Sequence, residues 1–376
     1  MRLFVRSRTR TKGGSKDGRK RRSPEELIAH GDYGEFIERH EKGEMVVAVA
    51  MKTLGSKLAD VRANAARALG SVGEEDADVV REAVPRLTRL LNDRNPRVRS
   101  NAAGALSIIG ESAAELLGDA VPRLVRLLKD GDAVARGNAA RALSVIARSD
   151  AELVNAAVPM LVWLLDDADS YVRGTACRAL WTLGETDVAV LQDAASRLVG
   201  LLSDVDAYVR GEATYALSVM GEVDAEAVKE AVPKLVVLLN DENVDVRSQA
   251  VSTLERIGER DAEAVKSAVP SLVRLLADQD ARVRLHSAWT LCEVAGSDTH
   301  AVRGAVPRLI RLLNDEEASV RHGAACALRR IDQGDGHLVE DAIPALLRLV
   351  ESQQGGHGNA AWALGMVGER EAEPEP

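Results

Sequence analysis

Apolar residues in this chain fall on helical stripes. One stripe consists of Val98, Ala102, Ala105, Leu106 and Ile109. Steps of four, three, one and three residues place these side chains on one face of a helix, because an α-helix turns once in about 3.6 residues. The stretch before it carries a second stripe, made of Leu87, Leu90 and Leu91. The pattern therefore predicts two amphipathic helices in succession.

This pair of stripes returns every 37 residues. An arginine near the start of the second helix, called here the repeat arginine, marks the period at Arg62, Arg99, Arg136, Arg173, Arg210, Arg247, Arg284 and Arg321. A proline in the first helix marks it again, at Pro85, Pro122, Pro159, Pro233, Pro270, Pro307 and Pro344. One helix pair cannot bury its own apolar stripes, whereas stacked pairs can. The sequence predicts an all-α fold, a right-handed α-solenoid of about nine 37-residue repeats.

Residues at the helix ends follow the same period. Pro85 suits the first turn of a helix, where the N–H that proline lacks has no intrahelical partner. Glycines recur near the end of the second helix, where we expect them to act as C-cap residues. They are Gly110, Gly184, Gly221 and Gly258.

An aspartate precedes the repeat arginine by six residues in seven consecutive repeats. We expect the carboxylate and the guanidinium of one repeat to bond each other and the backbone of the turn between them. Stacking would then arrange these pairs as a structural ladder along one edge of the solenoid. The pairs are Asp93 and Arg99, Asp130 and Arg136, Asp167 and Arg173, Asp204 and Arg210, Asp241 and Arg247, Asp278 and Arg284, and Asp315 and Arg321.

Composition and charge divide the chain into parts. Hydrophobic residues make up 46% of it and aromatic residues only 3%, so the core must be aliphatic and rich in alanine. The net charge is −9, but residues 1–22 carry +9 and the remainder carries −18. We expect a disordered basic tail at 1–22, an N-terminal capping helix at 23–44, the repeat solenoid at 45–369 and an acidic C-terminal tail at 370–376.

The repeat pattern resembles the HEAT and armadillo families of helical repeats. The resemblance rests on the sequence pattern "AVPxLvxLLxDxxxxVRxxAAxALxxIG" and covers roughly residues 45–369. Members of these families are all-α solenoids whose concave face is built from the last helix of each unit. They typically serve as scaffolds, adaptors and peptide-binding rods. The resemblance implies a non-catalytic scaffold or adaptor that binds a protein or peptide partner in its concave groove.

Three positions of the second helix lie opposite the core stripe, namely one, five and eight residues after the repeat arginine. We expect them to line the concave groove. Large side chains gather at positions five and eight, and Trp, Tyr and Arg are the residues that dominate binding hot spots. The alternative is that these side chains are wedged between neighbouring helices. The candidate partner-binding residues are Arg67, Arg141, Arg178, Trp181, Tyr215, Trp289, Arg329 and Trp362.

Two other functions stay open. Residues 1–22 and the groove arginines would suit a nucleic-acid-associated protein, although a body of net charge −18 repels a polyanion. Some HEAT-like proteins are lyases or other enzymes, which makes an enzyme the second alternative. A metal site is conceivable, but its spacing matches no standard zinc pattern, so we expect no metal, no cofactor and no catalytic residue. Its ligands would be His286, Cys292, His322 and Cys326.

The cysteines and the hydropathy indicate a location. Cys177, Cys292 and Cys326 form no CxxC pair, which predicts reduced thiols in a cytoplasmic protein. No apolar run approaches the roughly 18 residues that a membrane-spanning helix needs. We therefore expect no membrane span.

Overall fold

The structure is a computed structural model of the chain. It describes residues 43–335 and 343–351, together with residues 26, 30, 337 and 361. The predicted tails at 1–22 and 370–376 lie outside these residues, as does most of the predicted capping helix at 23–44. The described residues form helices and turns without a β-strand. Among these helices, none combines the length and the apolar character needed to cross a lipid bilayer.

Each of the first eight repeats contains a first helix and a long second helix, as the sequence predicts, and the structure describes the first helix of the ninth. The first helices are α3 (Gly43–Thr53), α5 (Val84–Leu90), α7 (Val121–Leu127), α9 (Val158–Leu164), α12 (Ala195–Leu201), α15 (Val232–Leu238), α18 (Val269–Leu275), α21 (Val306–Leu312) and α23 (Ile343–Glu351). The long helices are α4 (Ala59–Glu75), α6 (Pro96–Ala113), α8 (Ala133–Ser149), α10 (Ser170–Gly184), α13 (Ala207–Val223), α16 (Val244–Arg260), α19 (Ala281–Ser297) and α22 (Ala318–Gly334).

A short helical segment leads into most of the first helices. In four repeats it begins with a single α-helical turn: α11 (Ala189–Gln192), α14 (Ala225–Val228), α17 (Ala262–Val265) and α20 (Thr299–Val302). The proline then stands in the first turn of the first helix, as Pro85 does in α5. A polar side chain caps most long helices, and Asp132 accepts a hydrogen bond from the N–H of Ala135 at the start of α8.

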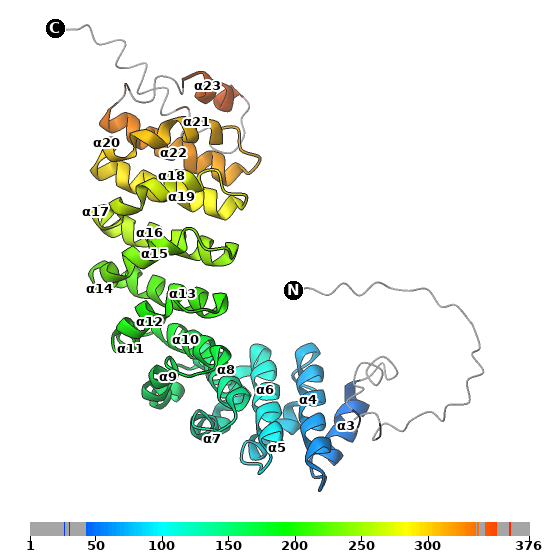
Figure 1. Cartoon of the computed structure of the whole chain (residues 1–376). Coiled ribbons are helices and arrows are strands. Elements are labelled where there is room, and N and C mark those ends of the chain that lie inside the picture. Colours follow the sequence, from blue (N-terminus) through cyan, green and yellow to red (C-terminus); the bar gives the residue numbers. More distant parts are fainter. Residues whose placement is uncertain are drawn as a thin grey trace, which may run out of the picture.

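The repeats stack into a curved rod that runs from α3 to α23 (Figure 1). Successive long helices pack directly on one another, whereas successive first helices touch at few points. The closely spaced layer lies on the inner side of the bend, and Figure 1 shows α4, α6 and α8 inside, with α5 and α7 outside. The long helices therefore build the concave face. The predicted fold class, an all-α solenoid of stacked repeats, is confirmed.

Aliphatic side chains fill the space between the two layers of helices. Leu87, Leu106 and Ile109 are completely buried there. Small side chains such as Ala102 and Ala105 are also buried, and Ala105 lies against Gly70 of the preceding long helix. Because alanine adds little bulk, the long helices can approach one another closely. A core of this kind needs no aromatic residues, which fits the composition.

The glycines near the ends of the long helices do not act as C-caps. Neither Gly110 nor its counterparts Gly184, Gly221 and Gly258 adopt the left-handed backbone conformation of a C-cap. Gly110 lies inside α6, which continues to Ala113. A Cβ atom at Gly110 would stand 2.6 Å from Cδ1 of Leu117. The C-cap prediction was wrong, because this glycine makes room for the segment that leads into the next repeat.

The repeat arginines bond one repeat to the next. Arg99 donates from Nε and Nη2 to the carboxylate of Asp130, each at 2.7 Å. Its Nη1 donates to the backbone carbonyl of Asp93 at 2.8 Å. The Asp130 carboxylate also accepts from the N–H of Asp132, 2.9 Å away, in the turn before the next long helix. The same bidentate bond joins Arg62 to Asp93, Arg136 to Asp167, Arg173 to Asp204, Arg210 to Asp241, Arg247 to Asp278 and Arg284 to Asp315.

This pairing differs from the one expected from the sequence. The expectation joined the carboxylate of Asp93 to Arg99, which follows it by six residues in the same repeat. In the structure that carboxylate binds Arg62 of the preceding repeat, and Arg99 reaches only the Asp93 backbone. Each bidentate bond therefore crosses a repeat boundary. At the C-terminal end Arg321 binds the backbone carbonyl of Asp315 at 2.7 Å. The following repeat has Ser352 in place of the aspartate, and this residue lies outside the described part of the chain.

The inter-repeat bonds should contribute measurably to stability. Replacing Arg173 with Lys removes the parallel bonds to Asp204, since an ammonium group cannot reproduce a bidentate guanidinium. We expect a loss of about 1–3 kcal/mol in the free energy of unfolding, measured by urea titration and circular dichroism. The matched change Arg81→Lys, in the exposed pair with Asp78, should cost less than about 0.5 kcal/mol. Equal losses in the two variants would contradict the assignment.

The aspartates of these bonds should also make stability depend on pH. Burial acts to raise the pKa of Asp167, but hydrogen bonds from Arg136 and Asp169 outweigh it and lower the pKa overall. The net direction is the same for Asp93, Asp130, Asp204 and Asp315. A carboxyl whose pKa is lower in the folded state stabilises the fold above its unfolded pKa of about 3.9, and this stabilisation is lost as the pH falls through the folded-state value.

Thermal unfolding should therefore occur at lower temperature as the pH falls below about 4, while the midpoint stays nearly level between about pH 5 and 7. Asp167→Asn cannot titrate and should show a smaller acid-induced decrease than the unmodified chain, in melting curves recorded from pH 7 down to the acid limit of folding. An identical acid dependence for the variant and the unmodified chain would show that this carboxylate is not responsible.

Candidate functional site

Positions five and eight after the repeat arginine meet across the boundary between repeats. The side chain at position eight of one long helix packs against that at position five of the next. Trp181 and Tyr215 meet in this way, edge to face, with ring centroids 4.5 Å apart. Cys292 and Cys326 do the same, with 3.5 Å between their Sγ atoms. At these two boundaries the surface is built of a side-chain pair to which each repeat contributes one member.

Position eight is less exposed than the sequence suggested. Ser107 and Ser144 are buried at that position, and Ser100 is buried at position one. The residues of α6 that are not buried are Pro96, Arg97, Arg99, Asn101, Gly104, Ile108, Glu111 and Ser112. Position five is among them, but positions one and eight are not. Each long helix packs on a first helix and on a long helix to either side, so its buried arc is wider than the single stripe predicted from the sequence.

The predicted partner-binding residues lie on this face with different exposures. Arg67 is exposed, and Trp362 lies outside the described residues. The rest are half-buried, so each is packed between helices and still presents an edge to the concave side. They are Arg141, Arg178, Trp181, Tyr215, Trp289 and Arg329.

A charged and aromatic cluster occupies the middle of the concave face, between α10 and α13. Glu212 accepts hydrogen bonds from Nε of Arg178 at 3.1 Å and from Nε1 of Trp181 at 2.8 Å. The Arg178 guanidinium also lies over the ring of Tyr208, 5.7 Å from its centre. Burial, and after it the charge of Glu212, raises the pKa of the Tyr208 phenol, which stays protonated at neutral pH. Glu212 thus fixes the orientation of two predicted binding residues.

Neither Glu212 nor Tyr208 is among the residues that the sequence predicts to bind a partner. Glu212 follows its repeat arginine by two residues, a position that asparagine holds in other repeats. Tyr208 covers Gly174 of the preceding long helix, where a Cβ atom would lie 2.2 Å from the ring. The sequence does contain a pattern that indicates this contact, namely a glycine in the repeat before an aromatic residue. The pattern predicts a contact only when the stacking of the helices is known.

A groove of about 560 Å³ opens beside this cluster. It is lined by Trp181, Ala207, Tyr208, Gly211, Glu212, Tyr215, Asn243, Asp245, Val246 and Gln249. Space above Gly211 is open, because a Cβ placed there would meet no atom within 4 Å beyond its chain neighbours and the backbone of its own helix. Asp245 pairs with Arg282 at 3.0 Å. Within the described residues Gln249 makes no hydrogen bond through its side chain, so its amide is available to a ligand.

Acidic side chains accompany the groove arginines of the N-terminal half. Nη2 of Arg141 lies 3.9 Å from Glu111, and Arg148 binds the same carboxylate at 2.6 Å. Farther along the solenoid, Arg178 of α10 is bound to Glu212 of α13. The inner surface is therefore mixed in charge rather than cationic.

The C-terminal repeats place the four conceivable metal ligands in separate contacts. Nδ1 of His286 lies 2.5 Å from the Glu255 carboxylate, and the ring of His322 lies against Trp289 with centroids 5.7 Å apart. The thiols of Cys292 and Cys326 touch each other instead. No group of three His, Cys, Asp or Glu side chains suited to hold a metal occurs in the part of the chain that the structure describes.

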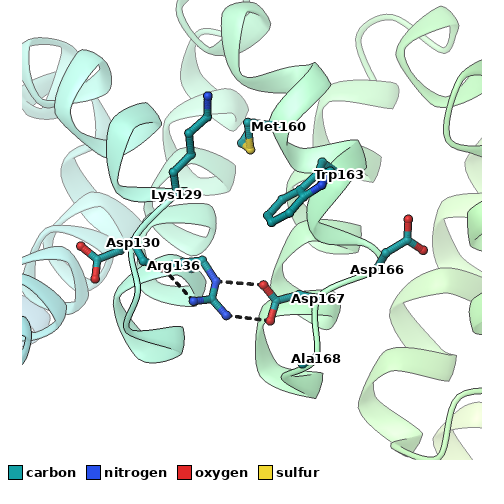
Figure 2. A pocket seen from close by; sticks show the side chains of 8 residues that line it. All are labelled: Lys129, Asp130, Arg136, Met160, Trp163, Asp166, Asp167 and Ala168. Atoms are coloured by element: carbon teal, nitrogen blue, oxygen red, sulfur yellow. Dashed lines mark hydrogen bonds and ion pairs between the residues drawn. The ribbon is translucent and has the colours of Figure 1, made fainter.

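A second hollow, of about 630 Å³, lies away from the concave face beside the first helix α9. Figure 2 shows Trp163 and Lys129 on opposite sides of it, with Met160 nearby and the bond between Arg136 and Asp167 at one edge. Trp163 is 58% exposed, the highest exposure of a large aromatic residue in the described part of the chain. Sequence reasoning missed it, although the corresponding residue is arginine in four other repeats, at Arg89, Arg126, Arg274 and Arg311.

Stacked helix pairs, bonds between repeats and a long-helix concave face define a repeat scaffold of the α-solenoid class. The family model for HEAT repeats matches residues 47–144 and 269–365, just over half of the chain. The chain belongs to the HEAT repeat family. The adaptin N-terminal region model matches residues 142–280 in between. Among curated proteins, no sequence matches the chain.

Two solved structures resemble the chain in fold. An engineered protein from a structural genomics consortium superposes with a TM-score of 0.75 at 27% identity, covering 92% of this chain and 93% of that one. A designed armadillo repeat protein in complex with the peptide (KR)4 superposes with a TM-score of 0.51 at 27% identity, covering 56% of this chain and 99% of that one.

The role of Glu212 can be tested by tryptophan fluorescence. Glu212→Ala removes the acceptor of the Trp181 N–H and the carboxylate partner of Arg178, so the indole should become more mobile and more accessible to water. In a chain with phenylalanine at the other three tryptophans, we expect red-shifted emission and faster acrylamide quenching. Glu185→Ala, which removes only a 3.4 Å contact with Tyr215, is the control. Unchanged quenching in Glu212→Ala would refute the positioning role.

Proposed function

We propose that the chain is a non-catalytic scaffold or adaptor that binds a protein or peptide partner along its concave face. The observation that carries the proposal is the groove between α10 and α16, where three aromatic rings and charged groups surround an open hollow. Half-buried rings such as Trp181 and Tyr215 are held in place before binding, which lowers the entropic cost of association. Such rigid aromatic anchors are typical of binding hot spots.

The chemistry of the lining favours an extended peptide segment. The side-chain amide of Gln249 can donate one hydrogen bond and accept another, which is what a peptide backbone offers in return. Tyr208 and Tyr215 supply apolar surfaces for side chains beside that amide. The designed armadillo protein that was solved in complex with a peptide supports an occupant of this type.

Nucleic-acid binding through residues 1–22 and the groove arginines has less support. Arg178 is bound to Glu212 and Arg141 lies near Glu111, and a polyanion would have to displace or repel these carboxylates. No observation on the described residues favours the remaining alternative, a HEAT-like lyase or other enzyme. The cytoplasmic location belongs to the proposal as well.

Peptide selection followed by an affinity measurement tests the proposal. Peptides selected from a displayed library on the full chain should bind it in fluorescence anisotropy. The concave variant, in which Trp181, Tyr215 and Trp289 are all changed to Ala, should bind at least about tenfold more weakly, because each hot-spot truncation costs more than about 1 kcal/mol.

The matched control is Trp163→Ala, which removes an exposed tryptophan from the other side of the solenoid and should leave the affinity within about twofold. Equal affinity of the concave variant and the unmodified chain would overturn the proposal. Loss of binding in Trp163→Ala alone would move the partner to the hollow beside α9. Circular dichroism of each variant checks that the helices remain folded.

A further inference from the structure

We propose that Cys292 and Cys326 form a redox-modification site, at which a hydroperoxide converts the two thiols into a disulfide that joins α19 to α22. The two Sγ atoms are 3.5 Å apart, in contact with each other. They are the position-eight and position-five residues of neighbouring repeats, the same positions that bring Trp181 onto Tyr215. Their proximity is therefore set by the stacking of the long helices and not by a mobile loop. The inference does not depend on the proposed function.

The surroundings of the two sulfurs make them unequal. Nη2 of Arg329 lies 3.7 Å from the sulfur of Cys326 and can donate to it. The hydrogen bond from Cys292 lowers the pKa of Cys326, and Arg329 and His322 act in the same direction against the effect of burial. That hydrogen bond and burial raise the pKa of Cys292. Since the thiolate is the reactive form, Cys326 is the nucleophile and Cys292 is the resolving thiol.

The reaction is balanced in two steps. The Cys326 thiolate attacks the terminal oxygen of a hydroperoxide, the O–O bond breaks, and the alkoxide leaves and takes up a proton as an alcohol, with Cys326 as its sulfenic acid. The Cys292 sulfur then attacks the Cys326 sulfur, the S–O bond breaks, and the hydroxide leaves as water with the Cys292 proton. Overall, two thiols are oxidised and one hydroperoxide is reduced. A dithiol reductant reverses the change.

Cys177 provides a control within the same chain. It lies in α10 with its side chain completely buried, and burial raises its pKa. No second cysteine lies near it in the described residues, because the other two occupy α19 and α22. Cys177 should therefore keep its thiol under conditions that oxidise the pair.

Mild oxidation of the purified full chain tests the inference. After treatment with a few equivalents of hydrogen peroxide, two of the three thiols should become unreactive in a thiol assay under denaturing conditions. Peptide mapping should then find Cys292 linked to Cys326 within one chain. Dithiothreitol should restore all three thiols. The variant Cys177→Ser should lose both of its thiols in the same way.

Two further variants separate the roles of the sulfurs. Cys292→Ser lacks the resolving thiol, so Cys326 should accumulate as a sulfenic acid that dimedone traps. Cys326→Ser should be labelled at least about tenfold more slowly, because its two remaining thiols, Cys177 and Cys292, are protonated at neutral pH. Should either variant fail to fold by circular dichroism, the peptide map of the unmodified chain still decides. Retention of all three thiols while glutathione in the same tube is oxidised, or a link that involves Cys177, would overturn the inference.

Discussion

The bond from each repeat arginine to the aspartate of the following repeat is the interaction on which the rest of this structure depends. Arg99 donates two parallel hydrogen bonds to the carboxylate of Asp130. That carboxylate also accepts a hydrogen bond from the backbone N–H of Asp132, just before the next long helix. A bond between two side chains would allow neighbouring helices to slide, but this one also ends on the backbone at both sides. It therefore fixes how far each long helix is shifted relative to the next.

That fixed shift explains why the surface of the concave face is regular. If the shift varied, position eight of one helix would meet different positions of the next in different places. Because it is constant, the same geometry brings Trp181 onto Tyr215 and Cys292 onto Cys326. The proposed partner binding and the proposed thiol chemistry thus depend on one packing rule, and the residue types at the contact distinguish the two pairs of repeats.

The sequence predicts the helices well because their signals are local. An apolar spacing of three and four residues and a proline in a first turn depend only on the chain nearby. The sequence does not reveal which aspartate binds Arg99, since partners six residues before it and 31 residues after it both recur with the same period. Stacking decides between them.

The candidate site was predictable in part for the same reason. Position five reaches the concave face because it lies far from the core in any single helix, so Arg178 and Tyr215 were found. Glu212 and Trp163 were not, since the first acts across a repeat boundary and the second lies on a first helix. The prediction for Gly110 was wrong because the glycine is needed to leave room for the side chain of Leu117, and not to end a helix.

The pairing of position eight with position five has a consequence for how such a chain can change over time. Each of these contacts joins two neighbouring repeats, so a single repeat never contains a complete contact. Inserting one whole repeat between two others would keep the arginine-to-aspartate bonds, because the ends are interchangeable, and the rod would still form. Placed between α10 and α13, it would nevertheless separate Trp181 from Tyr215 and give each a new neighbour. The solenoid thus tolerates a change in the number of repeats, and the same change alters which side chains meet on its concave face.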